Sequence, residues 1–274
     1  MLTVERILKQ ELCENQVGVW YLGQVGFLLK AADSYLALDP YLSDYVDKNC
    51  CEFVNWKRNY APPIKPEDIS FVDYVVCTHS HYDHTDPITI SEIAKNNPNT
   101  KFIIPAPYAS NVTEYGVDIK NIIFAKAFEE IKLKDFTLIP IPAAHEELHT
   151  DASGDFCELG YIIKANGQTF FHAGDMCMYN GLIEALEKYD INIAFLPING
   201  RDYFRNNNDI IGNFNPEEAV LLAKRINADI LVPMHHDLYD VNSVDASVFV
   251  NAINKYHPFR KYHIFSPGEL YISV

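Results

Sequence analysis

Four side chains that can bind metal ions fall within six consecutive positions of this 274-residue chain. They are His79, His81, Asp83 and His84, and they directly follow a predicted strand that ends at Cys77. Two histidines spaced two residues apart point in a common direction if the extended conformation continues. A single tetrahedral site seldom takes four ligands from so short a stretch, so the cluster predicts two adjacent cations.

Three later residues occupy equivalent positions along the chain. His145, Asp175 and His235 each come shortly after a predicted strand, and His236 is an alternative to His235 as a ligand. In open α/β sheets, ligands bind beyond the carboxyl ends of the strands, where residues distant in sequence can meet. We therefore expect these side chains and the first cluster to form one site.

The types of ligand predict the chemistry of that site. Five imidazoles and two carboxylates, without a thiolate, suit divalent metals and leave positions for water. We expect two divalent ions, Mn²⁺ or Zn²⁺ ahead of Fe²⁺. Two cations roughly 3.5 to 4 Å apart can share a carboxylate and a hydroxide, and can lower the pKa of water toward about 7. Asp175 is the best candidate for the shared carboxylate, and the prediction is metal-dependent hydrolysis.

Other polar residues near these positions have two interpretations each. Asp39 ends a predicted strand, and it either accepts the spare N–H of a ligand histidine or caps a turn. His236 and Asp237 adjoin His235 and are candidates for contact with substrate. Arg201 is either an anchor for an anionic substrate group or a solvated surface arginine.

Strand-like and helix-like segments follow one another in an order that can position these residues. Residues 1–15 predict a short amphipathic helix, and residues 17–22, 26–30 and 35–38 predict an antiparallel meander. From residue 72 strands alternate with helices, including a helix from Ala106. The pattern predicts mixed sheets flanked by helices, hence an α/β layered fold in one domain spanning residues 1–274.

Residues 41–72 show no strand or helix period. The segment is rich in aromatic residues and contains Pro62, Pro63 and Pro66. A long loop in a compact domain is often functional, so we interpret it as a lid over the site, with a plain surface excursion as the alternative.

Composition narrows the classes of partner. A net charge of −15 and a pI near 5.0 argue against nucleic acid and anionic membranes as partners. The six cysteines show no Cys-x-x-Cys spacing, which is typical of reduced thiols in the cytoplasm. Neither a secretory signal nor a membrane span is predicted. We expect a cytoplasmic protein acting on a small molecule.

The spacing His-x-His-x-Asp-His at residues 79–84, followed by His145, Asp175 in His-Ala-Gly-Asp, and His235, resembles the metallo-β-lactamase superfamily. The resemblance covers nearly the whole chain. Residues 20–26 (Trp-Tyr-Leu-Gly-Gln-Val-Gly), the Asp39-Pro40 pair and residues 232–237 (Val-Pro-Met-His-His-Asp) are similar to the L-ascorbate-6-phosphate lactonase branch. Residues 42–69 and 151–157 depart from the lactonase pattern.

The resemblance implies a four-layer αβ/βα sandwich with a dinuclear site. By this resemblance His79, His81 and His145 would hold one metal, Asp83, His84 and His235 the other, and Asp175 would bridge them. It also implies a cytoplasmic homo-oligomer, often associated with manganese, that opens a sugar-phosphate lactone such as L-ascorbate 6-phosphate. In that reaction Asp83 would handle the proton and Arg201 would bind the anionic group.

Three alternatives remain open at this point. The His-Tyr-Asp-His core also resembles N-acyl phosphatidylethanolamine phospholipase D, which would make the protein a phosphodiesterase. Flavodiiron relatives would use iron for redox chemistry, but they tend to carry Glu at the position of His81. A non-enzymatic metal-binding protein would keep the ligands without turnover.

Overall fold

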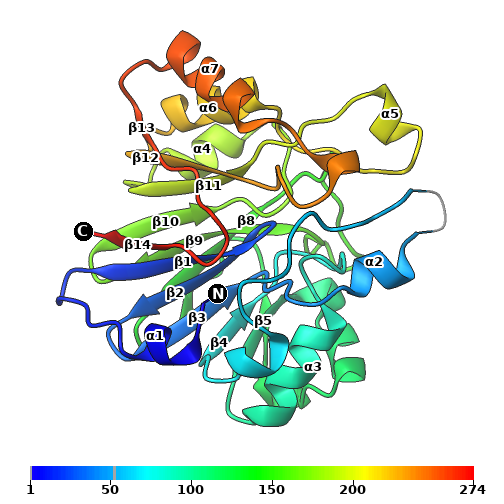
Figure 1. Ribbon diagram of the computed structural model, residues 1–274, viewed down its shortest axis with the longest axis vertical. Helices are drawn as coiled ribbons and strands as arrows, with labels where there is room; N and C mark the ends of the chain where they lie inside the picture. The colour runs from blue at the N-terminus through cyan, green and yellow to red at the C-terminus, as the bar shows by residue number, and fades with distance from the viewer. Residues whose placement is uncertain (1, 52–53) are drawn as a thin grey trace.

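Two seven-stranded sheets pack face to face in the computed structural model, which describes residues 2–51 and 54–274 (Figure 1). Each sheet combines a parallel and an antiparallel part. Helices lie on the outer face of each sheet (Figure 1). The predicted α/β sandwich is confirmed.

The first sheet has the strand order β14-β1-β2-β3-β4-β5-β6. The strands β14, β1, β2 and β3 are antiparallel neighbours, and β3 to β6 are parallel. Their bounds are β1 Val17–Gly23, β2 Gly26–Ala31, β3 Ser34–Leu38, β4 Tyr74–Val76, β5 Lys101–Pro105, β6 Ile122–Ala125 and β14 Leu270–Ser273.

The second sheet has the order β13-β12-β11-β10-β9-β8-β7. Here β10 to β13 are parallel, and β7 to β10 are antiparallel. Their bounds are β7 Ile131–Lys132, β8 Thr137–Pro142, β9 Leu159–Ala165, β10 Gln168–His172, β11 Ile193–Pro197, β12 Ile230–Met234 and β13 Lys261–Tyr262. The two closing strands β13 and β14 thus join different sheets.

The main hydrophobic core lies between the sheets. Along β1, Val19 and Tyr21 belong to this core, whereas Trp20 and Leu22 belong to a second core on the other face of the sheet. Successive side chains of a strand point to opposite faces, which explains why a strand covered on both sides is apolar throughout. Phe27 of the first sheet lies 4.3 Å, centroid to centroid, from Phe195 of the second.

Helices complete the outer layers. Helix α3 (Pro87–Asn96) buries Ile90 and Ile93 in the second core, against the first sheet. Helix α6 (Pro216–Arg225) begins with an Asn215–Glu218 capping box and packs with α7 (Ala246–Tyr256) beside the second sheet. The remaining α-helices are short: α1 Val4–Leu8, α2 Tyr45–Asn49, α4 Leu182–Leu186 and α5 Tyr203–Asn206.

One expectation about local structure was wrong, and two short strands were not predicted. The helix predicted from Ala106 is a pair of 3₁₀ turns, η2 (Ala106–Tyr108) and η3 (Asn111–Tyr115), and Gly116, with φ at +88°, ends the second of them. Strands β6 and β7, of four and two residues, are too short to show a strand period in the sequence. The other 3₁₀ helices are η1 Pro66–Ile69, η4 Ile119–Asn121 and η5 Asp240–Asn242.

The segment 41–72 is more ordered than a loop. It contains α2 and η1, and its Tyr41 hydroxyl lies 2.7 Å from that of Tyr239. The backbone N–H of Asn59 donates to Leu238 O at 2.8 Å, so the segment is tied to residues that follow β12. Glu52 and Phe53, which belong to the predicted lid, lie outside the described residues.

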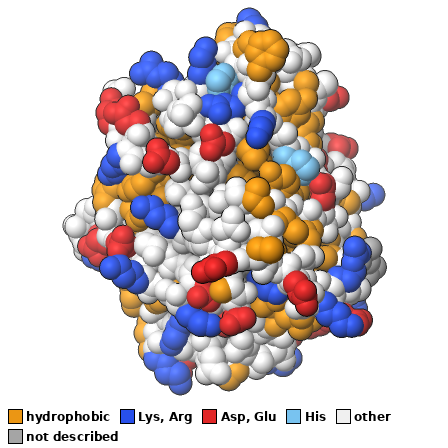
Figure 2. Space-filling model, turned by 90° about the vertical axis from the view of Figure 1, so that its left-hand side faces the viewer, with side chains coloured by type: hydrophobic (Ala, Val, Ile, Leu, Met, Phe, Trp, Pro, Cys, Tyr) orange, Lys and Arg blue, Asp and Glu red, His pale blue; other side chains and the backbone are white. Residues whose placement is uncertain are grey.

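The surface carries charges of both signs. On the side where the C-terminus lies in Figure 1, acidic and basic side chains lie close together, and the described residues form no continuous basic patch there (Figure 2). No helix within residues 2–51 and 54–274 combines the length and apolarity that a membrane crossing requires.

Candidate metal centre

The predicted ligands all lie at one rim of the sandwich, where strands of both sheets end. The loop after β4 carries residues 79–84, and β8, β10 and β12 are followed by His145, Asp175 and His235. Parallel strands in each sheet bring their carboxyl ends to the same edge, and the face-to-face packing brings the two edges together.

The structure gathers the seven side chains into two adjacent groups. Within each group, one ligand atom from each residue lies within 4.8 Å of every other. The first group is His79, His81, His145 and Asp175, and the second is Asp83, His84 and His235. His81 is the exposed member, and Asp83 is half-buried, while the others are buried.

Asp175 lies between the two groups. Its Oδ2 atom is 3.5 Å from His145 Nε2 and 3.5 Å from His235 Nε2, and its Oδ1 atom is 3.3 Å from His84 Nε2. Its position depends on Gly174, where φ is +62° and an added Cβ would lie 2.8 Å from the Thr78 side chain. A glycine at this point therefore lets the chain pass close to the loop after β4.

Asp39 orients the buried His84. Its Oδ2 atom lies 2.8 Å from His84 Nδ1, and its two oxygens also accept from the Thr78 hydroxyl at 2.7 Å and the Thr78 backbone N–H at 2.8 Å. Because a carboxylate only accepts, this contact places the proton of His84 on Nδ1 and leaves the lone pair of Nε2 facing the site.

Gln24 makes a similar contact to Asp83. Its Nε2 donates to Asp83 Oδ2 at 2.9 Å and lies 3.3 Å from His235 Nε2. The backbone N–H of Gln24 is held by the Tyr60 hydroxyl at 3.3 Å, and its carbonyl accepts from His235 N at 2.8 Å. Sequence reasoning missed Gln24, Thr78 and Tyr60, since none of these residue types marks a site by spacing alone.

Burial and neighbouring charges shift the pKa values of the ligand histidines in opposite directions. Burial lowers the pKa of His145 to about 4 and holds the pKa of His79 well below its usual value, so both imidazoles are neutral. For His84, burial opposes the charged form, yet Asp175, Asp83 and Asp39 outweigh it and raise the pKa well above its usual value. Without a cation Nε2 would therefore carry a proton, which a bound metal ion would displace to use the lone pair. Burial likewise opposes ionisation of Asp175, but His235 and His84 hold its pKa well below the usual range.

The donor atoms fit a pair of cations. His84 Nε2 and Asp175 Oδ1 are buried and have no hydrogen-bond partner among the described residues, although they lie 3.3 Å apart. Nitrogen atoms of neutral imidazoles also converge, with His79 Nε2 2.9 Å and His145 Nε2 3.3 Å from His81 Nδ1. Buried polar atoms without partners are costly, and a bound cation in each group would satisfy them.

Strained backbone accompanies the site. Four non-glycine residues here have positive φ: Gln24 (58°), Asp39 (38°), Glu146 (65°) and His235 (57°). Such conformations cost about 1–3 kcal/mol each and cluster where function requires a fixed geometry.

A cavity of about 450 Å³ opens onto the two groups. Its floor includes His81, Asp83, His145, Asp175 and His235. Its walls come from four segments: the 41–72 segment, the loop after β4, the loop after α5, and the residues after β12. The side chains are Val46, Cys50, Trp56, Ser80, Tyr82, Asp209, Ile210, Ile211, Tyr239 and Asn242. This volume is in the range of small-molecule sites.

The three residues predicted to contact substrate, Arg201, His236 and Asp237, do not line this cavity. Asp237 Oδ1 accepts instead from the Tyr60 hydroxyl at 2.8 Å. The guanidinium of Arg201 pairs bidentately with Glu218, at 2.7 and 2.8 Å. The structure thus supplies an intramolecular partner for the cation that was expected to bind substrate.

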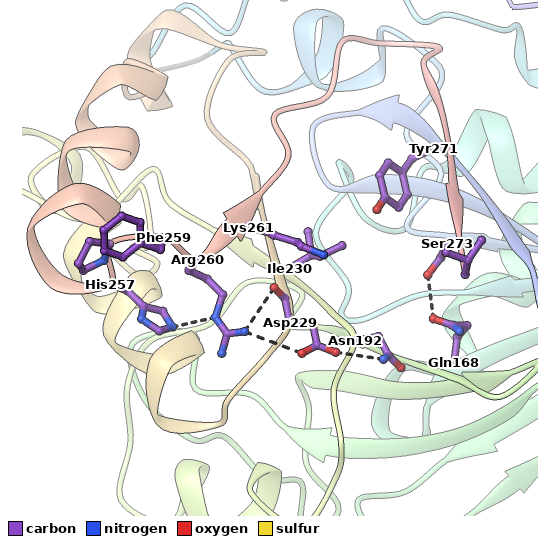
Figure 3. Close-up of a pocket in the computed structure, with 12 residues that line it drawn as sticks. Gln168, Asn192, Asp229, Ile230, His257, Phe259, Arg260, Lys261, Tyr271 and Ser273 are labelled. Atoms are coloured by element: carbon purple, nitrogen blue, oxygen red, sulfur yellow. Dashed lines mark hydrogen bonds and ion pairs between the residues drawn. The ribbon is translucent and has the colours of Figure 1, made fainter.

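A larger cavity, of about 570 Å³, lies away from this rim, between the edge strands β13 and β14 (Figure 3). It contains none of the predicted ligands. Arg260 in it donates to His257 Nε2 and to Asn227 Oδ1, both at 2.8 Å, and also lies 3.8 Å from the Asp229 carboxylate. The described residues that line it form no group of metal-binding side chains.

Solved structures share this architecture. The metallo hydrolase Igni18 from Ignicoccus hospitalis superimposes with a TM-score of 0.71 at 22% identity, covering 94% of this chain and 99% of that protein. An isothiocyanate hydrolase from Delia radicum gut bacteria superimposes with a TM-score of 0.72 at 20% identity, covering 93% and 98%. At these identities the likeness shows the fold.

Sequence comparison adds relatives that span nearly the whole chain. A UPF0173 metal-dependent hydrolase of Aeropyrum pernix is 27% identical over 264 residues, covering 92% of this chain and 95% of the relative. The UPF0173 metal-dependent hydrolase YtkL of Bacillus subtilis is 26% identical over 237 residues, covering 86% and 92%. These names specify no substrate, so the resemblance to the lactonase branch stays a prediction. The family described as the β-lactamase superfamily domain matches residues 36–236, and the chain belongs to this family.

Proposed function

We propose that this protein is a metal-dependent hydrolase that opens lactone rings at a two-metal site. The observation that carries the proposal is the convergence of seven metal-binding side chains around buried donor atoms that lack partners. The relatives named metal-dependent hydrolases support the coarser part of this proposal. The lactone is suggested by the sequence motifs at residues 20–26 and 232–237.

The side chains divide into two ligand sets. His79, His81 and His145 would hold one cation, and Asp83, His84 and His235 would hold the other. Asp175 would bridge them, because its two oxygens face ligand nitrogens of both groups. The ligand types, nitrogen and carboxylate oxygen without thiolate, suit Mn²⁺ and Zn²⁺.

When bound, two divalent cations supply an activated water at neutral pH and polarise the carbonyl of a substrate. Residues of the chain move the proton and orient the ligands. Asp83, at the half-buried edge of the cavity, accepts the proton that water loses, and Gln24 fixes the orientation of this carboxylate. Asp39 holds the His84 ring so that Nε2 lies on the side of Asp175, where it would bind a cation.

Atoms and charge balance in this reaction. The oxygen of water bonds to the carbonyl carbon, the ring C–O bond breaks, and Asp83 returns the proton to the leaving oxygen. The product is an open-chain hydroxy acid, and no oxidant or reductant takes part.

A substrate panel tests the proposal. The protein is purified without chelator, loaded with Mn²⁺ or Zn²⁺, and assayed on lactones and phosphodiesters, with L-ascorbate 6-phosphate beside uncharged lactones. We expect ring opening of at least one lactone and a loss of at least about 100-fold in kcat for Asp83→Asn. Asp190→Asn, at an exposed position outside the cavity, is the matched control.

Two results would refute the proposal. A metal-loaded protein that hydrolyses phosphodiesters and leaves every lactone intact would favour the phosphodiesterase alternative. A protein that binds metal but turns over neither class would be a non-enzymatic metal-binding protein.

A further inference from the structure

The cavity above the metal centre has an unusual charge balance. Among the described residues that line it there is no lysine and no arginine, whereas Asp83, Asp175 and Asp209 contribute carboxylates. Asp209 is exposed and belongs to neither ligand group. Two bound cations would attract one anionic group, but the ligand groups that would hold them are also where the reacting carbonyl must lie. Beyond that position the described lining offers no positive charge.

Two basic residues close in sequence to the cavity lining, Lys48 and Arg205, form ion pairs. Lys48 pairs with Asp44 at 2.9 Å, and Arg205 pairs with Asp202 at 2.8 Å and donates to Ser243 O at 2.7 Å. Arg58, whose buried Nε and Nη1 atoms have no hydrogen-bond partner among the described residues, lies 4.8 Å from the Tyr41 ring and lines a different cavity. None of these three basic side chains lines the cavity, so a phosphate group inside it would meet no cation directly.

The neighbouring cavity offers no free cation either. It shares His145 and Ile211 with the first and contains Arg201. Arg201 is bound by both oxygens of Glu218, and the same cavity is lined by Glu146 and Glu147. Negative charge therefore surrounds Arg201 in this neighbouring cavity.

The walls of the first cavity are largely apolar. Val46 and Trp56 come from the 41–72 segment, and Ile210 and Ile211 come from the loop after α5. The Trp56 ring packs edge-on against Tyr239, with centroids 5.2 Å apart and an interplanar angle of 83°. Segments far apart in the sequence thus build one apolar groove that leads to the metal centre.

The hydroxyl of Tyr239, a residue that lines the cavity, is already bonded. It lies 2.7 Å from the Tyr41 hydroxyl and donates to Asp47 Oδ1 at 3.0 Å. Tyr239 itself is only 2% exposed, so its ring mainly supports Trp56 from behind. Tyr239 therefore offers a substrate no free hydrogen-bond donor.

We infer that the substrate carries an uncharged, apolar substituent, which lies in the groove between Trp56 and Ile211 while the reacting carbonyl lies at the metal centre. This inference rests on the proposed hydrolysis and names its substrate class. Lactones that bear a phosphate or a second carboxylate are poor substrates, because their charge meets Asp209 and apolar walls without a compensating cation.

Matched substrates test the inference. The metal-loaded protein is assayed on γ-butyrolactones that carry a butyl or a hexyl chain, and on the hexyl compound ending in a phosphate monoester. We expect kcat/KM to rise about threefold or more from butyl to hexyl, since each buried methylene favours binding. We expect the phosphate to lower kcat/KM about tenfold or more. Equal or faster turnover of the phosphorylated compound would overturn the inference and leave the lactonase proposal standing.

Two variants assign the effect to the groove. Ile211 is 39% exposed, so Ile211→Lys adds a cation at the rim without burying it, and Ile119→Lys makes the same change at a remote, 55% exposed position. The preference is the ratio of kcat/KM for the hexyl lactone to kcat/KM for its phosphorylated form. We expect Ile211→Lys to lower this ratio roughly fivefold and Ile119→Lys to leave it unchanged. Asp209→Asn, which removes a negative charge from the cavity lining, should also lower this ratio. An unchanged preference in both groove variants would overturn the inference.

A binding measurement separates this inference from the proposed reaction. 2-Hexylcyclopentanone is an uncharged carbonyl compound that cannot be hydrolysed, and its binding is followed by the fluorescence of Trp56, with Trp56→Phe as the control. The other tryptophan, Trp20, is buried in the second core. The native protein could bind this ketone, lose the binding in Ile211→Lys, and still open no lactone. That result would support the apolar groove and refute the lactonase proposal. No binding to the metal-loaded protein would overturn the groove.

Discussion

Gln24 donates a hydrogen bond from Nε2 to Asp83 Oδ2 at 2.9 Å, across 59 residues of sequence. Gln24 stands in the turn between β1 and β2, with φ at 58°, and Asp83 stands in the loop after β4. The amide can approach only one oxygen of Asp83, so it selects one orientation of a carboxylate that both binds metal and moves a proton in the proposed reaction.

Replacing Gln24 tests this positioning. We expect Gln24→Ala to lower kcat roughly 10- to 100-fold with a smaller change in KM, because a hydrogen bond to a charged group contributes about 1.5–3 kcal/mol. Gln168→Ala is the matched control, since Gln168 accepts from Ser273 in the distant cavity. Measurement of metal content beside kcat distinguishes positioning of Asp83 from loss of metal. If kcat is unaffected at full metal content, Gln24 does not orient Asp83.

Asp39 is expected to control metal affinity through His84. Asp39→Asn removes the negative charge 2.8 Å from His84 Nδ1, and comparable changes weaken metal binding about 10- to 100-fold. Competition with a chromophoric chelator measures the affinity. Asp73→Asn is the control, because Asp73 also accepts a backbone N–H, from Tyr35 at 2.8 Å, but outside the site. Equal affinities in the two variants would contradict the role of Asp39.

Removing metal should lower thermal stability. Binding to the folded state alone stabilises by about 2.7 kcal/mol when the free ligand is at 100 times its Kd. For a protein of this size that corresponds to a fall in Tm of roughly 5 °C or more on chelation. Differential scanning fluorimetry with and without chelator measures it. In Asp175→Asn, which alters the proposed bridging carboxylate, the difference in Tm with and without chelator should be smaller. An identical Tm for the native protein with and without metal would argue against metal binding.

The Arg201–Glu218 pair makes a small, pH-dependent contribution to stability. Burial opposes ionisation of Glu218, but the hydrogen bonds from Arg201 and Asn215 outweigh it and lower its pKa below the usual value. A depressed folded-state pKa contributes stability above the unfolded pKa, and this contribution is lost as pH falls through the folded pKa.

Urea unfolding of metal-free protein at pH 7 and pH 3.5 measures this contribution. Glu218→Gln, which can keep the helix cap, should destabilise the protein at pH 7 by less than about 1 kcal/mol, since the pair is partly exposed, and should have a smaller effect at pH 3.5. Glu184→Gln, at an exposed position without an ion pair among the described residues, is the control. A destabilisation by Glu218→Gln that is the same at both pH values would show that the carboxylate charge has no part in it.

The sequence by itself determined most of the longer strands and helices and the candidate ligands. Strands such as 17–23 and 193–197 are apolar because they are covered on both faces, and that pattern is visible without coordinates. His79, His81, Asp83 and His84 are close in sequence, so their spacing predicts a shared site. His145, Asp175 and His235 could be added because each follows a strand, and strand ends converge in this class of fold.

Only the tertiary structure decided what surrounds those ligands. The contact of Gln24 with Asp83 joins segments that are 59 residues apart, and no local pattern encodes it. For Asp39 the sequence left open a ligand histidine or a turn cap, and the structure shows that it holds His84, 45 residues away. The pairing of Arg201 with Glu218 depends on how the loop after β11 meets α6. The apolar groove is likewise assembled from loops of unrelated sequence, because side-chain packing between distant segments, and not periodicity within one, sets the character of a cavity.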